Sequence, residues 1–273
     1  MATLIAHLVI GERVAATLGR LRSSPTVYAA FLLGCVLVDA NRYADLERHQ
    51  THLVKLSNGE GGGATTGSCA TFLKRRDSLL LRRWSTLTEP EQAFVAGYLC
   101  HLAADEAWLE VSRGLLEELG LETWKDLPVP AEVMVVTFNA LSQDLLDDFS
   151  AVASALEGAV IPGILRHVSQ HTFQRMWDVA RGYVLAGGGL DSYLGLLEAQ
   201  GRPDTDVETV RQQVDRYGGK ATALVQAAGG IERFIQPAVE RAVHVIPQLW
   251  HERSSNRRGC AVPGFRPRRS SAA

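Results

Sequence analysis

Apolar residues recur at helical spacing along most of the chain. The first such stretch covers residues 3–21, and a second begins at Pro25 and continues through the run VYAAFLLGCVLV to a stop near Asp39. The mixed polar and aromatic stretch at 40–56 predicts a loop that leads into a short helix, and a cationic helix is expected at 70–83. No sustained polar–apolar alternation of the kind that indicates strands is found in the sequence.

The clearest helix start is the segment Thr88-Glu-Pro-Glu91. A threonine N-cap, a proline in the first turn and a glutamate three residues after the cap form a capping-box pattern. The helix that begins here is expected to reach Leu119, before Gly120. Further helices are predicted at residues 130–157, 161–186, 190–200, 204–228 and 230–250. The pattern therefore predicts an all-α fold, with one multi-helix domain at 1–252 and a disordered tail at 253–273.

The charge distribution separates this tail from the rest of the chain. Hydrophobic residues make up 46% and charged residues 21% of the 273 residues, as in ordinary globular proteins. The net charge is -2, but six of the 28 basic residues are arginines within 253–273, which leaves 22 basic against 30 acidic residues elsewhere. An acidic body does not favour a nucleic-acid partner. An Arg-rich tail without apolar periodicity is expected to be disordered.

Cysteine usage and the first residues indicate a compartment. The 4 cysteines are dispersed and form no CxxC pair, which favours free thiols in a reducing environment. The stretch MATLIAHLVIGERVAATLGR lacks the basic start and the cleavage site of a signal peptide, and no apolar run is long enough for a transmembrane helix. A cytoplasmic location is therefore predicted.

A histidine and an aspartate interrupt the apolar character of GYLCHLAADEAW, residues 97–108. His101 and Asp105 are four residues apart, so their side chains leave one face of a helix about 6 Å apart along its axis. Imidazole nitrogen and carboxylate oxygen both suit zinc, so the pair can hold a divalent cation. A hydrogen-bonded pair without any metal has the same spacing.

Three further residues extend this pair. His7 lies between apolar neighbours in the first helix, and His52 ends the segment RHQTH. Asp39 terminates the second helix, where its carboxylate faces the unfavourable negative end of the helix dipole. Each residue has an ordinary structural explanation by itself. Together they supply the nitrogen and oxygen ligands of a metal site from four separate segments.

The motifs that carry these residues resemble the zinc-dependent phospholipase C family. They are AHLVI, FLLGCVLVD, RHQTH and GYLCHLAADEAW, and the resemblance covers roughly residues 4–110. It is closest to the short bacterial members of the family and implies an all-helical fold. It also implies zinc ligands at His7, Asp39, His52, His101 and Asp105, of which Asp105 would bridge two ions.

The same resemblance implies that Arg48, in the RxxTH pattern, faces the substrate anion. Two departures from the family favour a site with one or two metal ions over a site with three. The expected metal is zinc, and another divalent metal is the alternative. Val38 stands where the family often has a proline, and Met1 stands where secreted members use an amino-terminal tryptophan as a ligand. His167 and His171, four residues apart in a predicted helix, are further ligand candidates.

The reaction implied by the resemblance is hydrolysis of a small-molecule or lipid phosphoester by a zinc-activated water. Asp39 is expected to act as a ligand or as the general base toward that water. Lys74, Arg75 and Arg76 are candidates for binding the remaining negative charge of the substrate. The glycine-rich stretch at 59–68 is a candidate lid.

Two alternatives belong to other classes of function. A related metalloenzyme acting on a non-phosphate substrate would be indicated by an aromatic pocket mouth, for which Trp84, Trp108 and Trp124 are candidates. A non-catalytic helical interaction protein would fill all coordination positions of its metal with protein ligands.

Overall fold

The computed structural model describes residues 3–39, 47–53, 67–146, 148–199, 201 and 203–251. Within these ranges the regular structure consists of α-helices and short 3-10 turns, with one isolated bridge between Leu80 and Leu165. The predicted all-α class is confirmed. The Arg-rich tail at 253–273 and most of the glycine-rich stretch at 59–68 lie outside the described residues.

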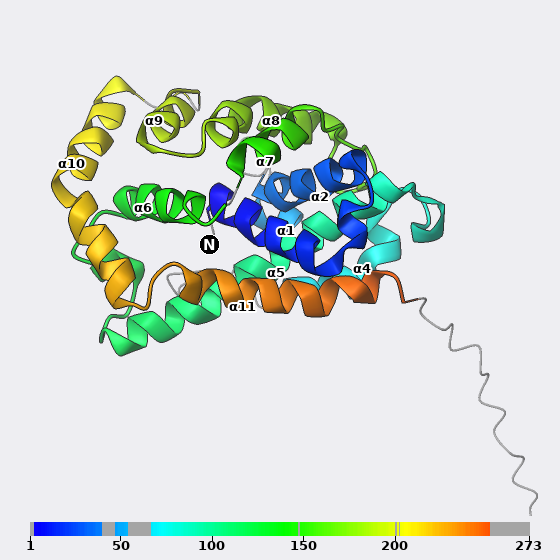
Figure 1. Ribbon diagram of the computed structural model, residues 1–273, viewed down its shortest axis with the longest axis horizontal. Helices are drawn as coiled ribbons and strands as arrows, with labels where there is room; N and C mark the ends of the chain where they lie inside the picture. Colours follow the sequence, from blue (N-terminus) through cyan, green and yellow to red (C-terminus); the bar gives the residue numbers. More distant parts are fainter. Residues whose placement is uncertain are drawn as a thin grey trace, which may run out of the picture.

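The helix α5 (Glu89–Glu118) occupies the centre of the molecule. It packs mainly against α2 (Pro25–Leu37) and α11 (Glu232–Val245), and α1 (Leu4–Leu18) contacts all three of these helices (Figure 1). These four helices contribute most of the main apolar core, because each of them presents fully buried aliphatic and aromatic side chains to the others.

The remaining helices surround this centre. The short α3 (Arg48–His52) brings His52 close to Asp105 on α5, and α4 (Ser68–Leu79) packs against α5. The others in chain order are α6 (Ala131–Gln143), α7 (Phe149–Glu157), α8 (Gln170–Leu185), α9 (Leu190–Ala199) and α10 (Asp204–Ala227). Helices α8 and α9 run along the top of Figure 1, and α10 closes one end of the molecule. Among the described residues, no helix is both long and apolar enough to cross a membrane.

The start of α5 follows the predicted capping box. The Glu91 carboxylate accepts hydrogen bonds from the Thr88 backbone N–H at 2.8 Å and from the Thr88 hydroxyl at 3.0 Å. Pro90 occupies the first turn, where its missing N–H has no helical partner to lose. The observed helix ends at Glu118, one residue before the predicted end.

Three predicted helices are interrupted or shortened. The cationic helix expected at 70–83 is observed at Ser68–Leu79. The stretch 130–157 forms two helices, α6 and α7, because the Asp148 carboxylate caps a new helix by accepting from the Ala151 backbone N–H at 3.0 Å. The stretch 161–186 is helical only from Gln170.

The first part of the stretch 161–186 pairs with another segment of the chain. The Leu81 backbone N–H donates to the Ile164 carbonyl at 2.8 Å, and the Arg166 backbone N–H donates to the Leu79 carbonyl at 2.8 Å. The predicted helical start at 161 is therefore wrong. The Pro162-Gly163 sequence is consistent with this irregular backbone.

Helices α2 and α5 cross at very short range through Gly34 and Gly97. A Cβ atom added to Gly97 would lie 3.0 Å from the Gly34 Cα atom and would overlap the Phe31 carbonyl oxygen. The reverse addition at Gly34 would overlap the Phe94 carbonyl oxygen. Only glycine allows the two backbones to approach this closely, and the crossing sets the distance between the candidate ligands on α5 and the end of α2.

The substitution Gly97→Ala tests this crossing. We expect it to lower the free energy of unfolding by about 1–3 kcal/mol, because the two backbones must separate to accommodate the methyl group. The matched control is Gly114→Ala on the same helix, where an added Cβ meets no atom of the described residues within 4 Å. That control should raise stability by roughly 0.5–1 kcal/mol. Urea denaturation of both variants measures the difference, and equal stabilities would contradict the proposed constraint.

Candidate metal centre

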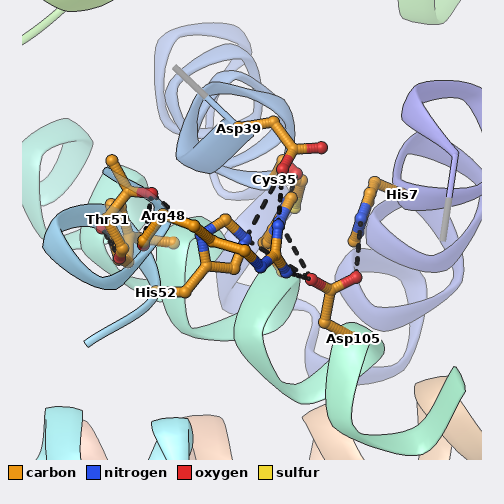
Figure 2. A network of polar contacts seen from close by, with 9 residues as sticks. His7, Cys35, Asp39, Arg48, Thr51, His52 and Asp105 are labelled. Atoms are coloured by element: carbon orange, nitrogen blue, oxygen red, sulfur yellow. Dashed lines mark hydrogen bonds and ion pairs between the residues drawn. The ribbon is translucent and has the colours of Figure 1, made fainter. Parts of the chain in front are cut away.

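All five predicted ligand residues meet at one buried point. His7 comes from α1, Asp39 follows the end of α2, His52 ends α3, and His101 and Asp105 lie in the middle of α5. Each residue is at most 2% exposed. Figure 2 shows side chains from these segments pointing toward one another. Their role as ligands remains a prediction, but their convergence is a property of the fold.

The two carboxylates face the three imidazoles. Asp105 Oδ1 lies 3.6 Å from His7 Nε2, and Asp105 Oδ2 lies 3.4 Å from His52 Nε2 and 3.9 Å from His101 Nε2. Asp39 Oδ1 lies 3.5 Å from His52 Nε2. These distances are longer than direct hydrogen bonds to imidazole. They bring the imidazole nitrogens and the carboxylate oxygens close to one another.

The orientation of two imidazoles is fixed by contacts to their Nδ1 atoms, which face away from the carboxylates. His101 Nδ1 lies 2.8 Å from the Cys35 carbonyl oxygen, and His52 Nδ1 lies 2.8 Å from the Thr51 hydroxyl oxygen. Because a carbonyl can only accept, the His101 proton resides on Nδ1 and the lone pair of the neutral ring is on Nε2. Such outer partners of metal-binding histidines select the tautomer that ligates.

The inward nitrogens have no hydrogen-bond partner. Nε2 of His7, of His52 and of His101 is buried and unpaired within the described part of the chain. The rings of His7 and His101 are stacked, with centroids 3.7 Å apart and planes 10° apart. Buried polar atoms without partners are rare and need an explanation. Coordination of a cation by these lone pairs would supply one.

The electrostatics of the site favour neutral His101 beside ionised Asp105. Burial and the adjacent His7 lower the pKa of His101 well below its ordinary value. For Asp105, burial alone would raise the pKa, but the His52 and His7 imidazoles outweigh it and the pKa is well below normal. Burial likewise opposes protonation of His52, but Asp105 and Asp39 prevail and raise the pKa of His52.

Arg48 connects the two carboxylates. Its guanidinium lies 3.4 Å from Asp39 Oδ1 and 2.5 Å from Asp105 Oδ2, and its side chain is 13% exposed. Arginine remains charged at every accessible pH. The positive charge also offsets the unfavourable position of Asp39 beyond the carboxyl end of α2. The structure places Arg48 beside the candidate ligands, and its expected role of facing the substrate anion stays a prediction.

The five residues form two overlapping groups that could hold a metal ion. One contains His7, His101 and Asp105, and the other contains Asp39, His52 and His101, each with its donor atoms within 4.8 Å of one another. Three nitrogen and oxygen donors per group match the ligand set of catalytic zinc sites. Because His101 is common to both groups and directs one lone pair inward, it can complete only one of the two groups at a time.

Three supporting residues were not identified from the sequence. Cys35 acts through its backbone carbonyl, Thr51 acts through its hydroxyl, and the buried Tyr98 hydroxyl donates to the Thr51 carbonyl. The Thr51 hydroxyl also lies 3.2 Å from the Arg48 carbonyl oxygen. The RxxTH and GYL motifs contain Thr51 and Tyr98, but a motif gives no indication of which partner each group contacts.

His167 and His171 do not share a helix face, so that prediction is wrong. His167 lies in the irregular segment before α8, with its Nε2 3.3 Å from the Tyr98 hydroxyl oxygen, whereas His171 is exposed in the first turn of α8. The pairing of 164–166 with 79–81 explains why no helix is present at His167. His167 therefore adjoins the site through Tyr98 and Thr51.

The predicted anion-binding residues on α4 have other partners or positions. Arg76 donates to the Leu249 carbonyl at 2.7 Å and lies over the Trp84 ring. Arg75 influences His167 electrostatically, and Lys74 is exposed. Arg76 therefore helps to pack the carboxyl-terminal turn.

The tryptophans considered for an aromatic mouth are also placed elsewhere. Trp108 packs in the core against Phe138 and Phe234, and Trp84 packs edge-on against Trp250. Trp124 lines a cavity of about 450 Å³ beside the 124–131 turn. Another cavity, of about 680 Å³, is lined by parts of α1, α2 and α7 and by none of the five site residues.

Comparison with known proteins identifies one family. Residues 6–108 match the family model described as zinc dependent phospholipase C. The resemblance inferred from the motifs is thus confirmed over this segment, which contains all five candidate ligands. No curated protein and no solved structure matches the chain. The family match and the two His/Asp groups together support a metal-dependent hydrolase.

The substitution Tyr98→Phe tests how α3 is held. Loss of the hydroxyl leaves the buried Thr51 carbonyl without this donor, so the free energy of unfolding should fall by about 1–2 kcal/mol. Amide hydrogen exchange at 48–52 should accelerate relative to the rest of the protein. Tyr217→Phe on α10, beside the 124–131 turn, is the control and should leave exchange in α3 unchanged. Unchanged exchange at 48–52 in the Tyr98 variant would refute the role of this hydroxyl.

The environment of His167 predicts a pH dependence of stability. Burial and the charge of Arg75 lower the pKa of His167 from 6.5 to about 4. Between these values the unfolded chain binds a proton that the folded chain excludes, so stability decreases as the pH falls. His167→Gln should reduce this slope, although His101 contributes in the same direction. The exposed His171→Gln is the control. Thermal unfolding between pH 7 and 4 is the measurement, and identical slopes in all three proteins would contradict the assignment.

Proposed function

We propose that this protein is a metal-dependent phosphoester hydrolase that uses one or two zinc ions. The observation that carries the proposal is the convergence of three inward-facing, unpaired imidazole nitrogens on two buried carboxylates. Buried imidazole nitrogens without hydrogen-bond partners are costly, and a bound metal ion would satisfy them. The family match at 6–108 supports the same conclusion.

His7, Asp39, His52, His101 and Asp105 would hold the metal in this proposal. When bound, zinc lowers the pKa of a coordinated water and neutralises negative charge on a phosphoryl oxygen. The Cys35 carbonyl keeps the proton of His101 on Nδ1, so that Nε2 remains available for ligation. Thr51 orients His52 in the same manner.

Two residues have roles beyond ligation. Asp39 is within reach of the same centre and would accept the proton of the attacking water where it does not serve as a ligand. Arg48 supplies a permanent planar cation at the centre, suited to bidentate contact with phosphoryl oxygens. Together they provide a base and an anion-binding group.

Two observations favour this function over the alternatives. Within the described ranges each metal group offers three protein donors, as in catalytic zinc sites that keep a position for water, whereas structural zinc sites are closed by four. The cation Arg48 borders the centre, whereas Trp84, Trp108 and Trp124 pack elsewhere. An anionic substrate fits these surroundings better than an aromatic one. The proposed substrates are small-molecule or lipid phosphoesters. The proposed location is the cytoplasm, as expected from the sequence.

Metal analysis of purified variants tests the proposal. His101→Ala and Asp105→Asn each remove a donor from the centre. Loss of a residue that only supports a ligand weakens metal affinity by roughly 10–100-fold, so loss of a ligand itself should weaken zinc binding at least as much. Hydrolysis of bis(p-nitrophenyl) phosphate should be lost in parallel and should return in the wild type when zinc is restored after chelation. The exposed His171→Ala serves as the matched control and should retain both properties.

The outcomes distinguish the alternatives. Metal content that is unchanged in both site variants would remove the ligand assignment. Zinc binding that depends on His101 and Asp105 without turnover of any phosphomonoester, phosphodiester or phospholipid would favour a metalloenzyme of another class or a non-catalytic protein.

A further inference from the structure

Arg48 occupies the same carboxylate oxygens that face the imidazoles. Its guanidinium contacts Asp39 Oδ1 at 3.4 Å and Asp105 Oδ2 at 2.5 Å. His52 Nε2 lies 3.5 Å and 3.4 Å from these same two atoms. A cation bound between His52 and the carboxylate oxygens nearest to it would therefore use atoms that the guanidinium already contacts.

The two cations oppose each other at this distance. Both carboxylates are 2% exposed, so water screens little of the repulsion between a guanidinium and a divalent ion bound to the same oxygens. Part of the affinity of the carboxylates for metal is consequently spent on displacing Arg48. Once displaced, the guanidinium loses its anionic partners and is left close to the metal with five donors to satisfy.

We propose that Arg48 is an internal counter-ion that competes with the metal for Asp39 and Asp105 and that binds the substrate phosphoryl group after the metal has displaced it. This inference rests on the proposed metal site. It makes metal binding and anion binding mutually reinforcing, because a bound anion holds the guanidinium away from the carboxylates. The protein would bind phosphate strongly only in the metal-loaded state.

The local structure permits this movement. Arg48 and His52 are four residues apart on α3 and therefore share one face of this short helix. His52 is fixed by the Thr51 hydroxyl, and α3 is fastened to α5 through the Tyr98 hydroxyl. Arg48 has a long side chain with several rotatable bonds, so its guanidinium can reorient while the His52 ring and the helix backbone stay in place.

Zinc affinity measured in competition with a chromophoric chelator tests the proposal. Removal of the competitor in Arg48→Gln should tighten zinc binding by roughly tenfold, a typical size for coupling between two sites. Arg48→Lys retains a charge without the planar fork and should give an intermediate affinity. The control is Arg233→Gln, which removes an arginine paired with Glu118 at the far end of α5 and should leave zinc affinity unchanged.

The coupling has its own readout. Inorganic phosphate, with free zinc held by a chelating buffer, should tighten zinc binding to the wild type by roughly tenfold and should have little effect on Arg48→Gln. Loss of the guanidinium leaves the two buried carboxylates less well paired, so the metal-free variant should melt at a lower temperature and gain more from added zinc than the wild type does. A variant that folds only with zinc can be refolded in its presence and titrated by chelation.

Weaker or unchanged zinc binding in Arg48→Gln would overturn the proposal. Weaker binding would mean that the guanidinium supports the metal ligands, and unchanged binding would mean that it does not compete with the metal for the carboxylates. Equal effects of phosphate on the wild type and on Arg48→Gln would overturn the coupling. These results differ from failure of the proposed function itself, in which the wild type would bind zinc no better than His101→Ala does.

Discussion

The burial of two carboxylates inside an apolar helical core is the constraint on which the arrangement of the site depends. Asp39 and Asp105 are almost completely removed from water, and an ionised carboxylate in such surroundings is stable only beside compensating charge or hydrogen-bond donors. The imidazoles of α1, α3 and α5 and the guanidinium of Arg48 provide that compensation. Four segments that are distant in sequence are therefore held at one point by the same electrostatic requirement.

The crossing of α2 and α5 allows this requirement to be met. Because Gly34 and Gly97 bring the two backbones into contact, the carboxyl end of α2 lies beside the middle of α5. The Cys35 carbonyl then reaches the His101 ring, and Asp39 reaches the same centre as Asp105. Packing thus determines which nitrogen of His101 is directed toward the carboxylates, and the chemistry of the centre follows from the contact between two glycines.

The sequence predicted the parts of the molecule that depend on local patterns. Helical periodicity and the Thr88–Glu91 cap located α5 to within one residue. The resemblance of the His and Asp motifs to the zinc-dependent phospholipase C family implied which side chains share a site. The irregular 161–169 segment escaped prediction because its backbone hydrogen bonds go to Leu79 and Leu81, far away along the chain. The partners of Thr51 and Tyr98 escaped it for the same reason, since a contact between distant segments leaves no periodic signal.

The main-chain contact at Cys35 has a consequence for how this site can vary among related chains. The carbonyl that accepts the hydrogen bond from His101 Nδ1 belongs to the last turn of α2, where backbone oxygens have no partner within the helix. Any residue at position 35 supplies the same oxygen, so the side chain there takes no part in this hydrogen bond and is constrained by the space around it. The thiol already fills the space beside Gly11, where an added methyl group would come within 2.9 Å of the sulfur. Positions 11 and 35 should therefore change together, with a bulkier residue at one matched by a smaller residue at the other.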